Sequence, residues 1–387
     1  MRAFVLTDPA LASHAGRFVW LDLNTDETAN EPVLQKHEAD ALPTFMVVDP
    51  KDERVVLRWV GSLTVPQLEA FLEEARATLR GVGKAASPED AALVRADALY
   101  GARQYAEAAA AYREALAKAP TGWPRYSRAV EALLYSYQST DAYAQAVALA
   151  REARSRLAGT PSALTASLGG LDSALELPKD DAGRAAGIAE MEAALRAAVA
   201  DATVVVAADD RSGAFGSLLQ ARRQAGDEAG VKRVAAEWAA FLEGEALKAR
   251  SPEERAVFDS HRLSAYLALG DPGRAIAMLR ASEKELPRDY NPPNRLARAY
   301  ASLKEWDEAL AASSRAESLA QGRAKLRVLS LRASLLEEKG DVAAARRTYD
   351  EAIVFGEALP ADERPVKTIE QLRKQREKLL APPKPRE

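Results

Sequence analysis

The sequence of 387 residues contains no cysteine and only three histidines, His14, His37 and His261. The lack of cysteine excludes disulfides, zinc–thiolate sites and thiol catalysis from this chain as written. The histidines are far apart in the sequence and none is paired with another at helical spacing, so we expect no metal site. We also expect no cofactor, because there is no phosphate loop, and the GVG at 81–83 does not follow a strand as a dinucleotide-binding turn would.

Long apolar runs and an excess of basic residues are also missing. No run approaches the roughly 18 apolar residues of a membrane-spanning helix, and the net charge is −4. Nucleic-acid-binding proteins usually carry a clustered basic excess. We therefore expect neither a membrane span nor nucleic-acid binding. The residues after Met1 include no sustained apolar segment, so the sequence as written predicts no signal peptide and a cytoplasmic location.

The N-terminal part, before the stretch GVGKAASP at 81–88, holds short apolar runs rich in Val, Phe and Trp. Asp, Pro or Gly bound these runs, which predicts strands at 18–24, 44–49 and 54–60. The last two are separated only by PKDE and should pair antiparallel. Thr64 is expected to cap the next helix, whose apolar stripe comprises Leu68, Phe71, Leu72, Ala75 and Leu79.

From residue 88 to residue 380 the sequence is alanine-rich with helical periodicity, and ATVVVAA at 202–208 is the one possible strand. Tyr266 and Tyr300 are 34 residues apart, and each is followed nine residues later by an alanine. Turns between helices are expected at the Gly-Asp pairs 226–227, 270–271 and 340–341. The fixed period favours stacked repeats over a generic alanine-rich bundle.

This pattern resembles the tetratricopeptide repeat, whose 34-residue unit forms two antiparallel helices with small residues at their closest approach. The resemblance is clear at 89–122 and 256–357, and the sequence between is degenerate. It implies an all-α helical-repeat solenoid over 89–360, with a capping helix and tail at 361–387. Such arrays mostly bind segments of other proteins in a concave groove.

The N-terminal part resembles the C-terminal two-thirds of the thioredoxin family, through FVWLDLN at 18–24, ALPTF at 41–45 and the hairpin that ends at Gly61. In that family an aliphatic-Pro-Thr triplet opens the strand beside the active site. Its proline is cis, and the residue before it hydrogen-bonds an extended peptide. The resemblance implies an incomplete α/β thioredoxin-like domain over 1–80, without its first central strand and Cys-x-x-Cys, and a linker at 81–88.

Together these features predict a non-catalytic protein-interaction module that binds other proteins or peptides. One part of the binding surface is the thioredoxin-like peptide groove, and the other is formed by polar side chains on the first helix of repeat pairs. The predicted peptide-binding residues are Leu42, Pro43, Thr44, Asn291, Asn294, Arg298 and Arg327. No residue is predicted to be catalytic.

Two alternatives stay open at this point. In one, the natural chain extends upstream of Met1 and is an exported thiol–disulfide oxidoreductase, periplasmic or secreted, whose cysteines lie outside this sequence. In the other, the chain is a scaffold in which the thioredoxin-like part is a structural relic. The sequence does not identify the client protein, the oligomeric state or the compartment.

Overall fold

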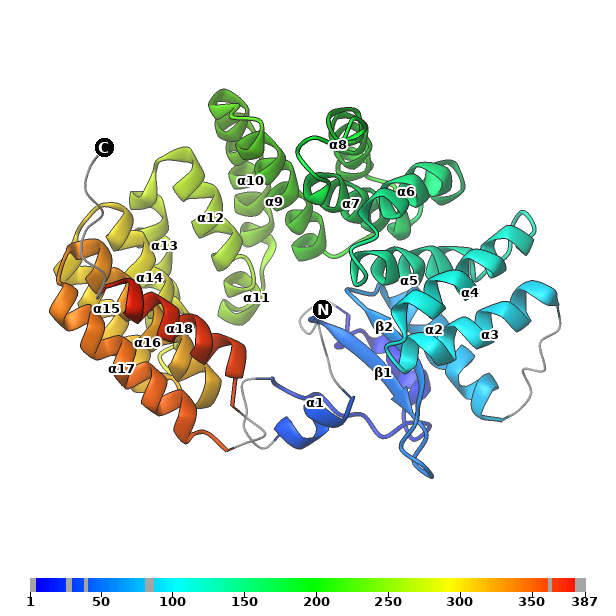
Figure 1. The fold of residues 1–387 in the computed structure, drawn as a ribbon, viewed down its shortest axis with the longest axis horizontal. Coiled ribbons are helices and arrows are strands. Elements are labelled where there is room, and N and C mark those ends of the chain that lie inside the picture. Colours follow the sequence, from blue (N-terminus) through cyan, green and yellow to red (C-terminus); the bar gives the residue numbers. More distant parts are fainter. Residues whose placement is uncertain (1–4, 26–29, 38–40, 81–86, 361–363, 380–387) are drawn as a thin grey trace. The chain divides into compact units, whose positions relative to one another are not determined.

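The computed structural model describes residues 5–25, 30–37, 41–80, 87–360 and 364–379. Internal contacts divide the chain into two compact units, the first comprising 1–18 and 39–234 and the second 19–38 and 235–387. The elements (Figure 1) are, in chain order, η1 (Pro9–His14), α1 (Glu31–His37), β1 (Thr44–Val48), β2 (Val55–Val60), α2 (Val65–Leu79), α3 (Pro88–Gly101), α4 (Tyr105–Lys118), α5 (Tyr126–Gln138), α6 (Tyr143–Leu157), α7 (Pro161–Glu176), α8 (Arg184–Ala200), α9 (Ala208–Gln224), α10 (Glu228–Lys248), α11 (Pro252–Ala256), α12 (Asp259–Leu269), α13 (Pro272–Glu285), α14 (Asn291–Ser302), α15 (Trp306–Leu319), α16 (Gly322–Lys339), α17 (Val342–Ala358) and α18 (Val366–Lys378).

The predicted hairpin is confirmed. Strands β1 and β2 pair antiparallel from Thr44 opposite Val60 onwards, with an irregularity between Val47 and Val48. The Asp49 amide donates to the Arg54 carbonyl at 2.9 Å and closes the predicted turn.

Helix α2 begins where the sequence predicts, because Thr64 forms a capping box with Gln67. Its buried side chains join those of β2 in one apolar core, which includes Leu57, Trp59, Leu68, Phe71, Leu72 and Ala75. Leu79, predicted to belong to this stripe, is 38% exposed at the end of the helix. The stripe is therefore one residue shorter than predicted.

The predicted strand at 18–24 is wrong, and the possible strand at 202–208 does not form. Residues 18–24, within the described stretch 5–25, form no strand, and Val19 and Leu21 are 90% and 73% exposed. A strand requires a neighbouring backbone to pair with, and the described residues supply a sheet of β1 and β2 alone. Residues 202–207 form a loop that leads into α9, since the Asp201 side chain accepts from the Thr203 amide and starts a turn.

In the first unit, helices α3 to α8 form successive antiparallel pairs that pack on their sequence neighbours. The first helices of the pairs also touch one another, α3 with α5, α5 with α7 and α7 with α9, so they make one layer. Strand β2 packs against α3 and α5 of this layer. The pairing includes α7 and α8, although the repeat pattern is poor at 160–250.

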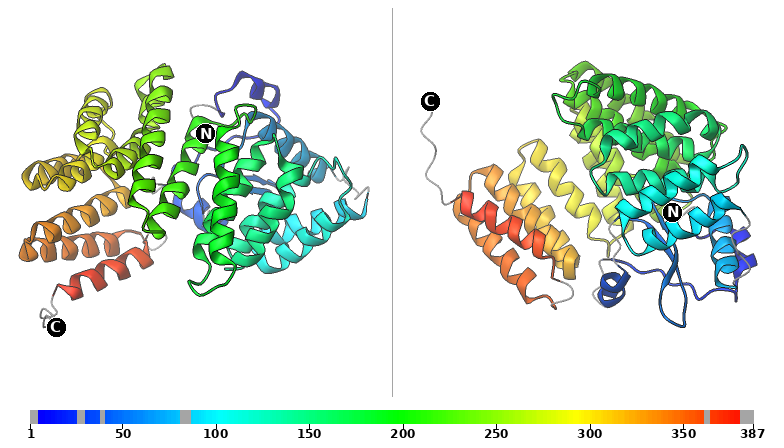
Figure 2. Two further views of the ribbon diagram at one scale, coloured as in Figure 1. Left: turned by 90° about the horizontal axis from the view of Figure 1, so that it is seen from above. Right: turned by 45° about the vertical axis from the view of Figure 1, so that its right-hand side comes forward.

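In the second unit, helices α12 to α17 form three further pairs, and α18 packs on α17 (Figure 2). The residues that carry the 34-residue period are core residues: Tyr266 and Tyr300 are 2% and 5% exposed, and Ala275 and Ala309 are fully buried. Small side chains at these positions let the helices of a pair approach closely.

The Gly-Asp pairs lie in turns between helices, as predicted. Gly226, Gly270 and Gly340 have φ angles of 67°, 79° and 87°, the left-handed conformation that glycine adopts without steric cost. Of the domain limits, residues 81–86 of the predicted linker and 380–387 of the predicted tail lie outside the described residues. Helix α18 lies within 361–387, the range of the predicted capping helix and tail.

Candidate functional site

The sequence-predicted residues at the start of β1 lie at the surface of the first unit. The Leu42–Pro43 peptide bond is cis, as the resemblance implies, and the Leu42 side chain is 65% exposed. The Pro43 carbonyl accepts from the Gly61 amide at 2.9 Å, and the Thr44 hydroxyl donates to the Ala41 carbonyl at 2.5 Å. These bonds fix the backbone on both sides of the exposed Leu42 side chain.

The other predicted residues lie on α14 and α16 of the second unit. The Asn291 side chain donates to Asp289 at 2.8 Å, so it shapes the turn into α14. Arg298 is exposed, and Arg327 donates to the Tyr290 hydroxyl at 2.7 Å, which links α16 to the start of α14. The structure thus places the predicted residues in two separate groups, one in each unit.

Asn294 differs from its neighbours on α14. Its Oδ1 atom is buried without a hydrogen-bond partner among the described residues. An unsatisfied buried amide costs free energy, so a ligand or water that donated to this atom would stabilise the protein.

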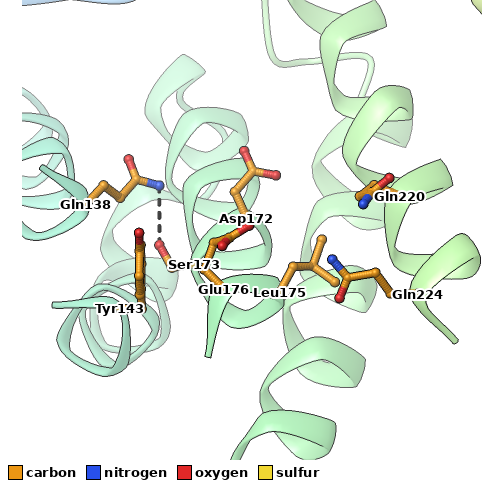
Figure 3. Close-up of a pocket in the computed structure, with 8 residues that line it drawn as sticks. All are labelled: Gln138, Tyr143, Asp172, Ser173, Leu175, Glu176, Gln220 and Gln224. Atoms are coloured by element: carbon orange, nitrogen blue, oxygen red, sulfur yellow. Dashed lines mark hydrogen bonds between the residues drawn. The ribbon is translucent and has the colours of Figure 1, made fainter. Parts of the chain in front are cut away.

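A hollow that the sequence does not predict lies over the first helices α5, α7 and α9 of the first unit (Figure 3). It has a volume of about 260 Å³. We call it the α7 hollow, and its lining residues are Gln138, Tyr143, Asp172, Ser173, Leu175, Glu176, Gln220 and Gln224.

The wall of the α7 hollow towards α5 is held by hydrogen bonds. Gln138 Nε2 donates to the Gly169 carbonyl at 3.1 Å and to the Ser173 hydroxyl at 3.2 Å. Ser173 in turn donates to Gly169 at 2.7 Å. The Gln138 amide nitrogen is therefore used inside the protein, and its Oε1 atom is the polar group left to accept from a ligand.

Two carboxylates, Asp172 and Glu176, lie one helical turn apart on α7, and neither forms an ion pair within the described part of the chain. Burial raises the pKa of the Asp172 carboxyl above its ordinary value; a hydrogen bond from Ser217 opposes this, and the charge of Glu176 adds to it. A positive charge placed beside Asp172 would favour the ionised carboxylate and lower this pKa.

Helix α7 can carry this site because it packs unusually close to its neighbours. A Cβ atom on Gly170 would lie 2.7 Å from both Ala150 Cβ and Met191 Sδ, and one on Gly169 would lie 2.5 Å from Leu134 Cδ2. At Gly170 the contact is with the Cβ atom of Ala150, which moves only with the backbone of α6, whereas at Gly169 it is with the end of the Leu134 side chain. The floor of the α7 hollow is consequently fixed by packing on α5, α6 and α8.

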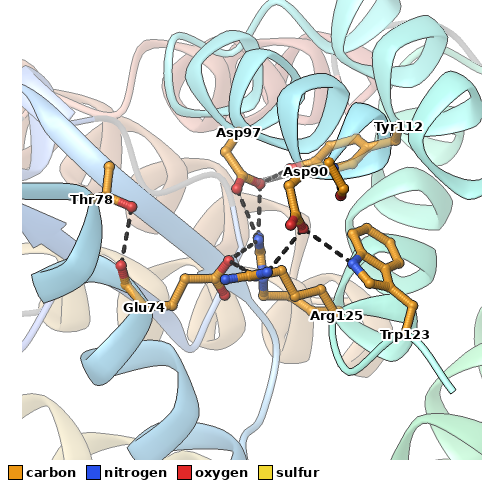
Figure 4. Close-up of polar contacts among 9 residues, drawn as sticks. Glu74, Thr78, Asp90, Asp97, Tyr112, Trp123 and Arg125 are labelled. Carbon is orange, nitrogen blue, oxygen red and sulfur yellow. Dashed lines mark hydrogen bonds and ion pairs between the residues drawn. The ribbon is translucent and has the colours of Figure 1, made fainter. Parts of the chain in front are cut away.

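A buried polar network joins α2 to the first helix pairs (Figure 4). Arg128 on α5 donates to both oxygens of Asp97 at 2.7 and 2.8 Å and to Glu74 of α2 at 3.0 Å. Tyr112 adds a third bond to Asp97 at 2.7 Å. Burial opposes the charge of Arg128, but Asp97 and Glu74 outweigh it and raise the pKa of the guanidinium well above its ordinary value.

On the solvent side of this network, Arg125 bonds Glu74 and Asp90 at 2.9 Å each, and Trp123 donates to Asp90 at 3.1 Å. The carboxylates of the network are all paired, so they fix α2 and its hairpin on the repeat layer rather than bind a ligand.

Neither a metal centre nor a membrane span is visible in the described residues. No group of three or more His, Asp or Glu in that part of the chain is placed to hold a metal ion. None of the described helices combines the length and apolarity needed to cross a bilayer.

Comparison with known proteins gives structural neighbours alone, since no family model and no curated protein sequence matches the chain. A tetratricopeptide repeat protein from Parabacteroides merdae is 13% identical over 75% of this chain and 99% of its own, with a TM-score of 0.45. The TPR2AB-domain:pHSP90-complex of yeast Sti1 is 16% identical over 75% and 98% of the two chains, with a TM-score of 0.28. Yeast Tom70 is 11% identical over 75% and 85%, with a TM-score of 0.21.

The helices of this chain form a tetratricopeptide-like helical repeat. The assignment rests on the paired helices, the layer of first helices and the buried tyrosines and alanines at 34-residue spacing. The described sheet, with two strands, does not establish a thioredoxin-like domain.

Sequence reasoning missed the α7 hollow because its residues come from helices far apart in the chain. A partial signal was present: Asp172 and Glu176 are spaced for one face of a helix, and Asp172 has no basic residue three or four positions away.

Proposed function

We propose that this chain is a protein-interaction module whose helical-repeat array binds an extended segment of another protein. The observation that carries the proposal is the α7 hollow, which collects polar side chains from three successive first helices on a rigid floor. At about 260 Å³ it is smaller than the usual site for a free small molecule, which has roughly 300–1,000 Å³. A side chain of a bound peptide suits it better.

The test is selection of displayed random nonamer peptides on the purified full chain, followed by hydrogen–deuterium exchange with a selected peptide. We expect protection from exchange in α5, α7 and α9. Failure to select any peptide, or protection that avoids these helices, would refute the proposal.

The basic and amide residues of the second unit are proposed as a further contact surface, with Arg298 and Arg327 on α14 and α16 facing an acidic partner segment. Exposure of both side chains supports this. Arg298→Glu should weaken the binding of acidic peptides selected on the full chain without changing its melting temperature. If the variant binds these peptides as tightly as the parent, Arg298 does not belong to the proposed contact surface.

The finer proposal, a thioredoxin-like peptide groove at Leu42, Pro43 and Thr44, is supported by the order β1, β2, α2 and by the exposure of Leu42. Leu42→Ala should lower peptide affinity but leave stability unchanged, because the side chain contributes little to the core. An unchanged affinity would favour the alternative in which the chain is a scaffold and its thioredoxin-like part is a structural relic. The oxidoreductase alternative needs a Cys-x-x-Cys, which this sequence does not contain. Top-down mass spectrometry of the protein from its host tests it.

A further inference from the structure

We propose that the α7 hollow binds an arginine side chain of the partner segment. This inference rests on the proposed function and deepens it, because it names the side chain that the bound segment must present.

The first argument is charge. Asp172 and Glu176 bring two carboxylates to one hollow, and none of the residues that line it is Lys, Arg or His. The Tyr143 hydroxyl donates to Asp141 at 2.7 Å and so lies beside a third carboxylate. A cationic group would meet attraction from this whole side of the hollow, whereas an acidic group would be repelled.

The second argument is the balance of donors and acceptors. The Gln138 nitrogen is bonded within the protein, as described above, which leaves an acceptor. Arg184, at the margin, is directed at protein acceptors: it donates to the Leu177 and Leu175 carbonyls at 3.0 and 3.1 Å and to Gln224 Oε1 at 2.5 Å. Arg184 therefore forms no ion pair with the two carboxylates, and their oxygens remain for a ligand rich in donors.

The third argument separates arginine from lysine. A guanidinium presents five N–H donors in a fixed planar fork and is more weakly hydrated than an ammonium group. The hollow offers acceptors from two helices, the Asp172 and Glu176 carboxylates on α7 and Gln138 Oε1 on α5. A planar fork can bond to a carboxylate through two N–H groups at once, whereas an ammonium group meets it as a point charge.

The experiment uses the full chain and the nonamer library described above, with three proteins compared side by side. The test variant is Asp172→Asn/Glu176→Gln. The matched control, Glu107→Gln/Glu308→Gln, makes the same change in net charge at exposed residues of α4 and α15. Thermal unfolding of each protein verifies that it is folded.

We expect arginine to be enriched at one position of the peptides selected on the parent and on the control, and not on the test variant. The tightest selected peptide is then resynthesised with citrulline, the neutral counterpart of arginine. Because a hydrogen bond to a charged group contributes about 1.5–3 kcal/mol, affinity for the parent should fall about tenfold or more. The test variant should bind both peptides alike.

Several results would overturn the inference while leaving the proposed function intact. These are selected peptides without arginine, equal enrichment of lysine, or equal affinity for the arginine and citrulline peptides. If the peptides selected on the test variant are also enriched in arginine, the peptide arginine binds at a site other than the α7 hollow. If no peptide is selected at all, the proposed function fails and this inference fails with it.

Discussion

At the scale of single residues, the most unusual group is Glu131 on α5. The residue is 9% exposed, and its Oε1 atom has no hydrogen-bond partner among the described residues. Burial raises the pKa of this carboxyl from 4.5 to about 7, although the neighbouring Ser162 opposes the shift. The native state therefore retains a proton that the unfolded state releases between these two pH values.

This makes stability depend on pH in a direction that can be stated. Below pH 4.5 both states are protonated. As pH rises from 4.5 to about 7, the unfolded state loses its proton first, so the native state loses stability relative to the unfolded one. Comparing urea unfolding at pH 5 and pH 8, we expect the parent to lose about 2–3 kcal/mol more than Glu131→Gln over this interval. If the two proteins lose the same free energy of unfolding over this interval, the pKa of Glu131 is not raised in the native state.

At the scale of elements, α2 is joined to α5 by a buried ion pair and a partly exposed one. Arg128 is 8% exposed and bonds Asp97 and Glu74, whereas the Arg125 side chain is 39% exposed. Removing one partner of a buried pair leaves a buried charge without compensation, whereas a solvated pair contributes little.

Arg128→Ala should therefore lower the free energy of unfolding by about 3–5 kcal/mol, and Arg125→Ala by about 1 kcal/mol or less. Urea denaturation of both variants measures the difference. Similar losses for the two would mean that the network is solvated throughout.

The close packing of α7 gives a second prediction at this scale. Gly170→Ala places a methyl group 2.7 Å from Ala150 and Met191 and should cost about 1–3 kcal/mol of stability. Gly216, in the interior of α9, has open space within 4 Å of the point that a Cβ atom would occupy, so Gly216→Ala should stabilise by up to about 1 kcal/mol. Opposite signs in thermal unfolding are expected; a stabilised Gly170→Ala would refute the close approach.

How far the sequence predicts these elements depends on how local their determinants are. The hairpin, the cap at Thr64 and the glycine turns depend on a few adjacent residues, and they were predicted. The strand at 18–24 required a pairing partner, which residue composition does not supply. The α7 hollow is formed by side chains of α5, α7 and α9, which are brought together by packing between helices that are distant in the sequence.

At the scale of the whole molecule, the chain comprises two compact units in which helix pairs pack on their sequence neighbours. In such arrays, stability is close to a sum of terms for each repeat and its nearest neighbours. A local defect should therefore remain local.

Gly170→Ala provides the test. Native-state hydrogen exchange should show faster exchange in α5 to α8 of the variant, and unchanged exchange in α14 to α17. If the loss of protection were uniform along the chain, the two units would unfold as one cooperative system instead.

The residues that fold the α7 hollow and the residues that would contact its ligand are different. Gly169 and Gly170 hold the helix in place, while Glu176, Gln220 and Gln224 are exposed and play no part in the apolar core. Natural variation at the exposed positions can thus change the charge of the hollow, and with it the preferred ligand, while the chain still folds. Related chains could share this scaffold and yet recruit unrelated partners.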